Sequence, residues 1–311
     1  MSSVGQTGKW ALAIHGGAGD TAEAELAAER EEQILEVLSA VLAQVSRGLA
    51  AGGSSLDAVE AATRGLEDSP LFNAGRGAVF NARGEHELEA SIMDGRKLAT
   101  GAVTSVHGVR NPVSLARLVM ERTAHVFLQG EGAMAFAREQ GVDLMPPEYF
   151  WTAERWEALE KARRRPRSEP TTGRYGTVGA VALDQHGNLA AATSTGGMTN
   201  KLAGRIGDSP IIGAGNYASN ASCAVSGTGH GEYFIRATVA RDVAAMLEYG
   251  GRNLKEATET VIKTRLASLG GTGGVIAVDR DAKIACSFNT SLMHRGFVSH
   301  SMPAQVVIWP Q

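Results

Sequence analysis

Features that identify several protein classes are absent from this sequence. It has only two cysteines, Cys223 and Cys286, without CxxC spacing, so it has no disulfide framework and suits a reducing compartment. No apolar run reaches the roughly 18 residues that cross a membrane, and the N-terminus lacks a basic segment followed by a long apolar stretch. We therefore expect a cytoplasmic protein without a membrane partner.

An excess of positive charge is also missing. Thirty Lys and Arg residues accompany thirty-three Asp and Glu residues, a formal net charge of −3, whereas nucleic-acid binding favours a basic excess. The eight histidines are scattered, without HExxH or a compact Cys/His set, so we expect no transition-metal site and no cofactor for catalysis. Glycine, by contrast, is about twice as frequent as usual and gathers beside Thr, His and Asp. This clustering predicts tight turns around a site.

The first half of the chain mixes strands and helices. Capping residues such as Ser54 and Asn111 mark helix starts, and apolar residues recur every three or four positions after them. These patterns predict a strand over 10–14, helices up to 47, over 55–65 and from 112, and a half-buried hairpin over 79–94. Arginine-rich residues 151–176 indicate a mobile linker; a basic nucleic-acid patch is the alternative, but no aromatic-rich surface follows it.

Antiparallel hairpins dominate the second half. Two strand-turn-strand patterns, 177–195 and 274–288, enclose helical patterns over 232–249 and 254–269. Because the helices are grouped instead of following each strand, the pattern favours an α+β fold over a doubly wound parallel sheet. A chain of 311 residues can bury such a core without covalent staples.

The first hairpin brings two threonines together. A register symmetric about His186 pairs Leu183 with Leu189. The same register places Thr177 directly opposite Thr195, with Cβ atoms about 5 Å apart on one face, so their hydroxyls could share a hydrogen bond. The plainer interpretation is a Thr–Thr pair that only favours the sheet.

Gly176, directly before Thr177, favours a catalytic role for this threonine pair. A threonine hydroxyl is a weak nucleophile unless a base takes its proton, and the residue's own free α-amine, with a pKa of about 7.7–8.0, can be that base. Cleavage between Gly176 and Thr177 would create the amine, and glycine permits the backbone geometry that this cleavage needs. The sequence therefore indicates a chain that cuts itself at this bond.

Charged and glycine-rich stretches follow the hairpin. Arg205 suits a carboxylate and Asp208 an ammonium, as in the head group of a free amino acid, although a surface ion pair is the plainer interpretation. Glycines before a helix could present Gly229 N–H and the Thr228 hydroxyl to an oxyanion. They also resemble a dinucleotide loop superficially, but no βαβ unit surrounds them, and His230 among them is equally well explained by solvent exposure.

Six ordered motifs resemble the plant-type L-asparaginases, also called isoaspartyl peptidases, of the N-terminal nucleophile hydrolases. They lie at Ile14–Gly19, Leu71–Gly75, Gly176–Asp184, Thr193–Met198, Gly204–Pro210 and Thr228–Glu232. The resemblance extends from Trp10 to about Thr290 and implies a four-layer αββα sandwich. It further implies a precursor that cleaves itself into an α subunit, residues 1–176, and a β subunit, residues 177–311, which together form one domain.

The resemblance also implies roles for individual residues. Thr177 is the expected nucleophile with Thr195 and Thr228 in support, Gly229 completes the oxyanion hole, and Asn73 lies beside the scissile carbonyl. The substrate is expected between two stretches, namely Arg205, Ile206, Gly207 and Asp208, and Thr228, Gly229, His230 and Gly231. Backbone carbonyls are expected to bind a structural Na⁺ at Leu66, Glu67, Ser69, Phe72, Ala74 and Arg76.

The implied activity is hydrolysis of β-aspartyl (isoaspartyl) dipeptides and L-asparagine with release of L-aspartate. The expected partners are a small-molecule or dipeptide substrate, no nucleic acid, and a second αβ unit in a dimer of αβ heterodimers. Within the class, a glycosylasparaginase is the alternative, and the lack of a secretory signal weighs against it. From a different class, the alternative is a non-enzymatic amino-acid binder that keeps the fold and never matures.

Overall fold

The computed structural model describes residues 8–21, 26–165 and 176–310. Its larger sheet contains, in spatial order, β12 (Met302–Val307), β11 (Leu292–Ser299), β1 (Ala11–Gly19), β5 (Val178–Leu183), β6 (Leu189–Thr195), β2 (Leu88–Asp94), β3 (Ala99–Val106) and β4 (Phe127–Gln129). The smaller sheet contains β10 (Ile284–Phe288), β9 (Gly273–Asp279), β8 (Cys223–Gly229) and β7 (Asn216–Ala218). All described strand pairs are antiparallel except β3 with β4.

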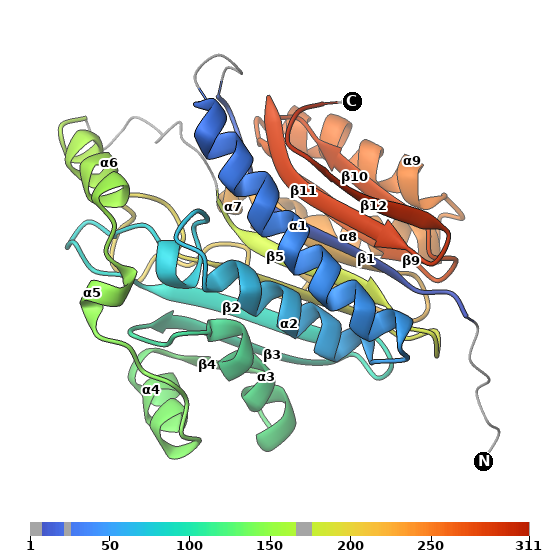
Figure 1. Cartoon of the computed structure of the whole chain (residues 1–311), viewed down its shortest axis with the longest axis horizontal. Coiled ribbons are helices and arrows are strands. Elements are labelled where there is room, and N and C mark those ends of the chain that lie inside the picture. The colour runs from blue at the N-terminus through green and yellow to red at the C-terminus, as the bar shows by residue number, and fades with distance from the viewer. Residues whose placement is uncertain (1–7, 22–25, 166–175, 311) are drawn as a thin grey trace.

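Helices cover the outer face of each sheet (Figure 1). The larger sheet packs against α1 (Ala28–Ala50), α2 (Ser55–Glu67) and α3 (Pro112–Arg122). The smaller sheet packs against α8 (Val239–Glu248) and α9 (Leu254–Glu259), which continues as a π-helix over Thr260–Leu266. The remaining short helices are a 3₁₀ turn at Gly75–Gly77, α4 (Gly130–Glu139), α5 (Pro147–Phe150), α6 (Ala153–Arg163) and α7 (Gly231–Ala237). The expected four-layer αββα sandwich and α+β class are confirmed.

Three apolar cores separate the four layers. Strand β1 shows how the sequence builds two of them, because alternate side chains of a strand point to opposite faces. Leu12 and Ile14 enter the core beneath α1 and α2, whereas Ala11 and Ala13 enter the core between the sheets. The small alanines face the opposite sheet, and all four side chains are buried.

The larger sheet interleaves strands from both sides of Gly176. Strands β5 and β6, which follow Gly176, are neighbours, and they are flanked by β1 on one side and β2 on the other, both of which precede Gly176. A cut at Gly176 would therefore leave the two parts joined by backbone ladders on both sides of β5 and β6. No helix in the described ranges is long and apolar enough to span a bilayer.

The predicted hairpin over 79–94 is wrong. Only 88–94 forms a strand, β2, and its partners are β3 and β6. The preceding residues form a local loop in which Asn81 Oδ1 accepts hydrogen bonds from the amides of Arg83 and Glu85. This side-chain turn satisfies the amides that a ladder would otherwise pair.

The predicted linker over 151–176 is also wrong in its first part. Residues 153–163 form α6, whose Thr152 cap accepts from the amide of Arg155, and residues 166–175 lie outside the described residues. Only Leu159 of this helix is buried, which explains the missing apolar periodicity. The predicted helix over 232–249 is interrupted at Thr238, whose φ of +47° is left-handed.

Candidate active site

The two threonines of the first hairpin meet as the register predicts. Strands β5 and β6 pair Leu183 with Leu189 and, at the other end, Val178 with Ser194. One residue further, Thr177 Oγ1 donates a hydrogen bond of 3.1 Å to Thr195 Oγ1. Both side chains are buried, so this hydroxyl pair is largely shielded from water.

Asn73 organises the backbone on both sides of this pair. Its N–H donates 3.0 Å to the carbonyl oxygen of Gly176, and its own carbonyl accepts from Gly196 N–H at 3.1 Å. Its side chain donates to the Gly197 carbonyl and accepts from the Val79 amide. The Gly176 carbonyl is therefore polarised by an N–H donor, which is the arrangement that stabilises a developing oxyanion.

His15 contacts the backbone of Thr177. Its Nδ1 lies 2.9 Å from the Thr177 carbonyl oxygen, and its Nε2 lies 2.8 Å from Ser226 Oγ, which in turn contacts Thr193 Oγ1. Burial lowers the pKa of His15 to about 3, so the ring is neutral. Since a carbonyl only accepts, Nδ1 carries the proton and Nε2 accepts from Ser226.

The predicted oxyanion loop lies at the end of β8. Thr228 is fully buried, and its Oγ1 accepts from the Ala18 amide of β1 at 3.2 Å. Gly229 has a φ of +152°, and a Cβ there would lie 2.4 Å from the Thr272 carbonyl oxygen. Only glycine fits this close approach, and α7 begins two residues later, at Gly231.

Arg205, Asp208 and Gly231 form one cluster. A Cβ on Gly231 would lie 2.8 Å from Arg205 Nη2 and 3.0 Å from Asp208 Oδ1, so both charged groups face this glycine. Asp208 Oδ2 is buried without a hydrogen-bond partner in the described structure, and burial raises the pKa of Asp208 to about 7. Such a carboxyl is suited to receive an ammonium group.

Glu232 holds the Arg205 guanidinium in this structure. Two hydrogen bonds of 2.9 Å join Arg205 Nε and Nη2 to the Glu232 carboxylate, which also lies 3.2 Å from His230 Nε2. Although burial opposes it, hydrogen bonds from His230 and Arg205 lower the pKa of Glu232 below its ordinary value. The side chain of Ile206, by contrast, is exposed and takes no part in this cluster.

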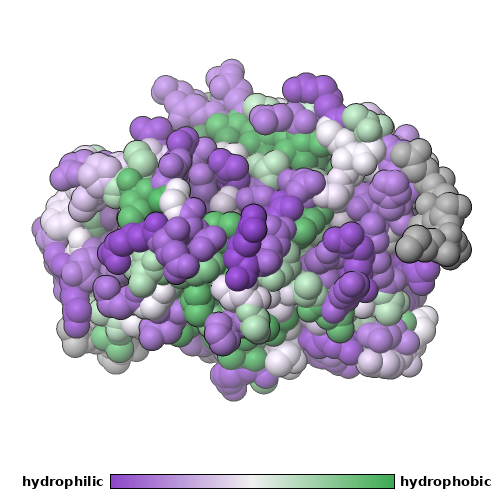
Figure 2. Space-filling view, turned by 90° about the horizontal axis from the view of Figure 1, so that it is seen from below, coloured by the Kyte–Doolittle hydropathy of each residue, from purple (hydrophilic) through white to green (hydrophobic). Residues whose placement is uncertain are grey.

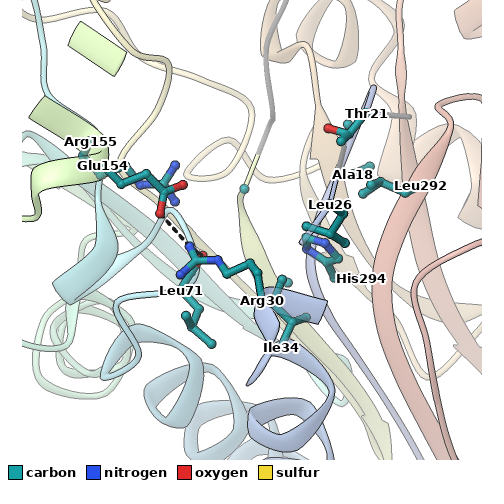
Figure 3. A pocket seen from close by; sticks show the side chains of 13 residues that line it. Ala18, Thr21, Leu26, Arg30, Ile34, Leu71, Glu154, Arg155, Leu292 and His294 are labelled. Atoms are coloured by element: carbon teal, nitrogen blue, oxygen red, sulfur yellow. Dashed lines mark hydrogen bonds and ion pairs between the residues drawn. The ribbon is translucent and has the colours of Figure 1, made fainter. Parts of the chain in front are cut away.

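A small cavity borders the Gly176 side of the bond between Gly176 and Thr177 (Figure 3). It measures about 50 Å³ and is lined by residues of β1, α1, α6 and β11 together with Gly176. Across it, Arg30 of α1 pairs with Glu154 of α6 at 2.8 Å. This ion pair attaches the last described helix before Gly176 to the body of the fold.

Apart from Arg76, the residues of the predicted cation loop are buried, and the loop folds back on itself. Carbonyl oxygens crowd its two central glycines: a Cβ on Gly77 would lie 2.1 Å from that of Phe72, and one on Gly75 would lie 2.5 Å from that of Glu67. The carbonyls of Leu66 and Ala74 each accept an amide within the loop. Arg76 points outward, with its guanidinium 5.5 Å from the Tyr149 ring centre. The described residues contain no cluster of His, Cys, Asp or Glu that could hold a metal.

Sequence reasoning missed several residues of this site. His15 and Glu232 stood within recognised motifs without a role, and adjacency to Gly-rich turns was the available signal. Ser226 gave no local signal for its contact with His15, because His15 lies on another strand.

The fold and the threonine at the start of a central strand define the class of N-terminal nucleophile hydrolases. The chain matches the asparaginase family over residues 8–308 and belongs to this family. It is 52% identical over 300 residues to the isoaspartyl peptidase of Escherichia coli (strain K12), with 93% of each chain covered. It is 44% identical over 328 residues to the probable isoaspartyl peptidase/L-asparaginase 2 of Arabidopsis thaliana, covering 97% of this chain and 99% of that one. The isoaspartyl peptidase/L-asparaginase of Homo sapiens is 42% identical over 285 residues, 91% of each chain.

Proposed function

We propose that this chain is a self-processing threonine hydrolase that releases L-aspartate from β-aspartyl dipeptides and L-asparagine. The observation that carries the proposal is the 3.1 Å hydrogen bond between Thr177 Oγ1 and Thr195 Oγ1, directly after Gly176. The names of the relatives, isoaspartyl peptidase and L-asparaginase, support the substrate class.

Maturation begins when Thr177 Oγ attacks the Gly176 carbonyl carbon. The Asn73 N–H already donates to that carbonyl oxygen and stabilises the negative charge that develops there. Collapse transfers the hydroxyl proton to the Thr177 nitrogen, breaks the Gly176–Thr177 peptide bond, leaves an ester on Thr177 Oγ and frees the Thr177 amine. Water then hydrolyses the ester, which gives a Gly176 carboxylate and an N-terminal threonine.

Turnover uses the same hydroxyl with the new amine as base. The amine takes the Thr177 Oγ proton as the oxygen attacks the substrate's side-chain carbonyl, and Thr228 Oγ1 and Gly229 N–H stabilise the oxyanion. The proton passes to the departing amine or ammonia. Water activated by the amine then hydrolyses the aspartyl ester and releases L-aspartate.

Arg205 and Asp208 select the substrate head group in this proposal. Asp208 receives the α-ammonium, and Arg205 receives the α-carboxylate in place of, or beside, the Glu232 carboxylate. Glu232 is 47% exposed on its side chain, so it can move into solvent as substrate binds.

A denaturing gel and N-terminal sequencing of the smaller product test the proposal. We expect two bands, with Thr177 as the new N-terminus, and one intact band of about 32.5 kDa for Thr177→Ala, which has no hydroxyl to attack. An intact wild-type chain that hydrolyses nothing would favour the amino-acid binder. Faster hydrolysis of an N-linked glycoasparagine than of β-aspartyl dipeptides would favour the glycosylasparaginase.

Three further features belong to this proposal. The backbone carbonyls of Leu66, Glu67, Ser69, Phe72, Ala74 and Arg76 would hold a structural Na⁺ that fixes the loop carrying Asn73.

Two αβ units would form a dimer, and the exposed side chains of Val126 and Phe127 at edge strand β4 support this arrangement. Hydrophobic residues also interrupt the hydrophilic surface on the underside of the molecule (Figure 2). The free cysteines suit the cytoplasm.

A further inference from the structure

A buried ion pair lies beside the site and has no part in the chemistry above. Lys201 Nζ lies 3.3 Å from Glu89 Oε1, and both side chains are 1% exposed. Lys201 Nζ also donates 3.0 Å to the carbonyl oxygen of Glu87. Burying two charges costs free energy that their mutual attraction often fails to recover, so stability alone explains such a pair poorly.

Glu89, one member of this ion pair, lies beside Thr195 of β6. It lies on β2, and the ladder between β2 and β6 places it directly opposite Thr195. Lys201 connects the pair to the turn after β6, because a Cβ on Gly197 would lie 2.7 Å from Lys201 Nζ. Gly197 N–H itself donates to Thr195 Oγ1 at 3.0 Å. Both members therefore adjoin residues that surround the Thr195 hydroxyl.

Glu89 also connects the pair to the head-group residues. Its Oε2 accepts from the Gly207 amide at 3.0 Å, and Gly207 stands between Arg205 and Asp208 in sequence. A Cβ on Gly207 would lie 2.9 Å from Arg205 Nη1 and 3.3 Å from Glu89 Oε2. One carboxylate thus fixes the loop that supplies both charged anchors.

We propose that Glu89 and Lys201 are positioning residues that set the substrate's head-group anchors, Arg205 and Asp208, at a fixed distance from the Thr177–Thr195 pair. The inference rests on the proposed function, since it names how that site is held. The anchors lie on a glycine-containing loop, and a substrate bound at its α-groups is delivered to Thr177 only if that loop is fixed relative to β6. A displacement of about 1 Å of a bound group can cost about 100-fold in rate.

The test compares Glu89→Gln with wild type. Glutamine keeps an oxygen for the Gly207 amide but removes the negative charge beside Arg205 and leaves Lys201 without its counterion. We expect processing at Gly176 to continue, because the precursor's own bond does not use Arg205 or Asp208. We expect kcat for a β-aspartyl dipeptide to fall about 10- to 100-fold, because a displaced head group no longer brings the scissile carbonyl to Thr177, and we expect KM to rise as well.

A pH readout separates positioning from general destabilisation. Arg205, Glu89 and Glu232 are the charged groups that act on Asp208, and His230 and Lys201 pair with the two glutamates. Removing the Glu89 charge lowers the pKa of Asp208, so L-aspartate binding should gain strength at a lower pH than in wild type.

Glu259→Gln is the matched control, because Glu259 pairs with Lys263 at 3.1 Å on the surface and should change neither KM nor the binding midpoint. A Glu89→Gln protein that processes normally, hydrolyses the dipeptide with the wild-type kcat and KM, and binds L-aspartate with the wild-type pH midpoint would overturn the inference. A Glu89→Gln protein in which processing, L-aspartate binding and the melting temperature all fall together would also overturn the inference, because that result indicates a structural role. A wild-type protein that neither hydrolyses β-aspartyl dipeptides nor binds L-aspartate would instead refute the proposed function.

Discussion

Thr195 is the residue at which Thr177, the turn after β6 and the Asn73 loop meet. Its Oγ1 accepts from Thr177 Oγ1 at 3.1 Å and from Gly197 N–H at 3.0 Å, and donates toward the Asn73 carbonyl at 3.4 Å. These contacts fix the direction of its lone pairs, and hence the position of the Thr177 hydroxyl. A sheet-forming threonine would need none of them.

Thr195→Val separates catalysis from sheet pairing. Valine keeps the shape and is at least as good a strand former, so the melting temperature should change little. Turnover of a β-aspartyl dipeptide should fall by about one to three orders of magnitude, because the nucleophile loses a hydrogen bond that orients it. Band intensities over time should show processing slowed in parallel, since the same hydroxyl attacks in both reactions. Thr195→Ser, which restores the hydroxyl, should recover most of both rates. Wild-type rates in Thr195→Val would reduce the pair to packing.

At the scale of elements, the segment that leads into β5 packs tightly against the loop that carries Asn73. Gly176 bonds to Asn73 through its carbonyl, and a Cβ on Gly176 would lie 2.7 Å from Asn73 Cβ and 3.0 Å from Asn73 N. There is no space for a side chain between the end of the α part and the loop that carries Asn73. The close approach to Asn73 thus requires glycine at the position before Thr177.

Gly176→Ala should therefore slow processing. The added methyl group pushes Asn73 away from the carbonyl that it polarises, and we expect a cleavage rate at least about tenfold lower on a time-course gel. Chains that do mature should show unchanged kcat, since residue 176 is no longer attached to Thr177. Gly48→Ala in α1, where a Cβ meets nothing within 4 Å, is the matched control and should process normally. Equal rates in the two variants would contradict this account.

At the scale of the whole molecule, one acid is buried where α2, β6 and α3 meet. Glu67 Oε1 accepts from the Val113 amide at 3.0 Å, Oε2 has no hydrogen-bond partner in the described structure, and burial raises the pKa of Glu67 to about 8. The folded protein therefore keeps this proton at neutral pH, whereas the unfolded chain loses it near the ordinary value of 4.5.

The sign of the pH dependence follows from that difference. Between about pH 4.5 and 8 the folded state binds more protons at Glu67 than the unfolded state does, so its contribution to stability falls as pH rises through this window. The slope from one proton is at most about 1.4 kcal/mol per pH unit. Denaturant unfolding of intact Thr177→Ala chains should show this fall, and adding Glu67→Gln should flatten it, because glutamine keeps the Val113 contact and does not titrate. Equal slopes in both proteins would show that Glu67 ionises normally when folded.

The sequence by itself determined features whose partners lie close along the chain. The hairpin symmetric about His186 placed Thr177 opposite Thr195, 18 positions apart, because register in a two-strand hairpin follows from its turn. The Ser54 cap of α2 follows equally from an amide three residues away. The predicted secondary structure was wrong at Asn81, where a side-chain turn takes the place of the expected strand pairing. It was also wrong at α6, because this helix buries almost no side chains and so shows no apolar periodicity.

Only the tertiary structure decided which distant residues complete the site. His15 meets the Thr177 carbonyl across 162 positions, and Lys201 meets Glu89 across 112. These contacts depend on β1 and β6 becoming neighbours of β5 and β2 in the larger sheet. The order of strands in a sheet is chosen by the burial of whole faces against other layers, a property of the complete fold that no local pattern of residues contains.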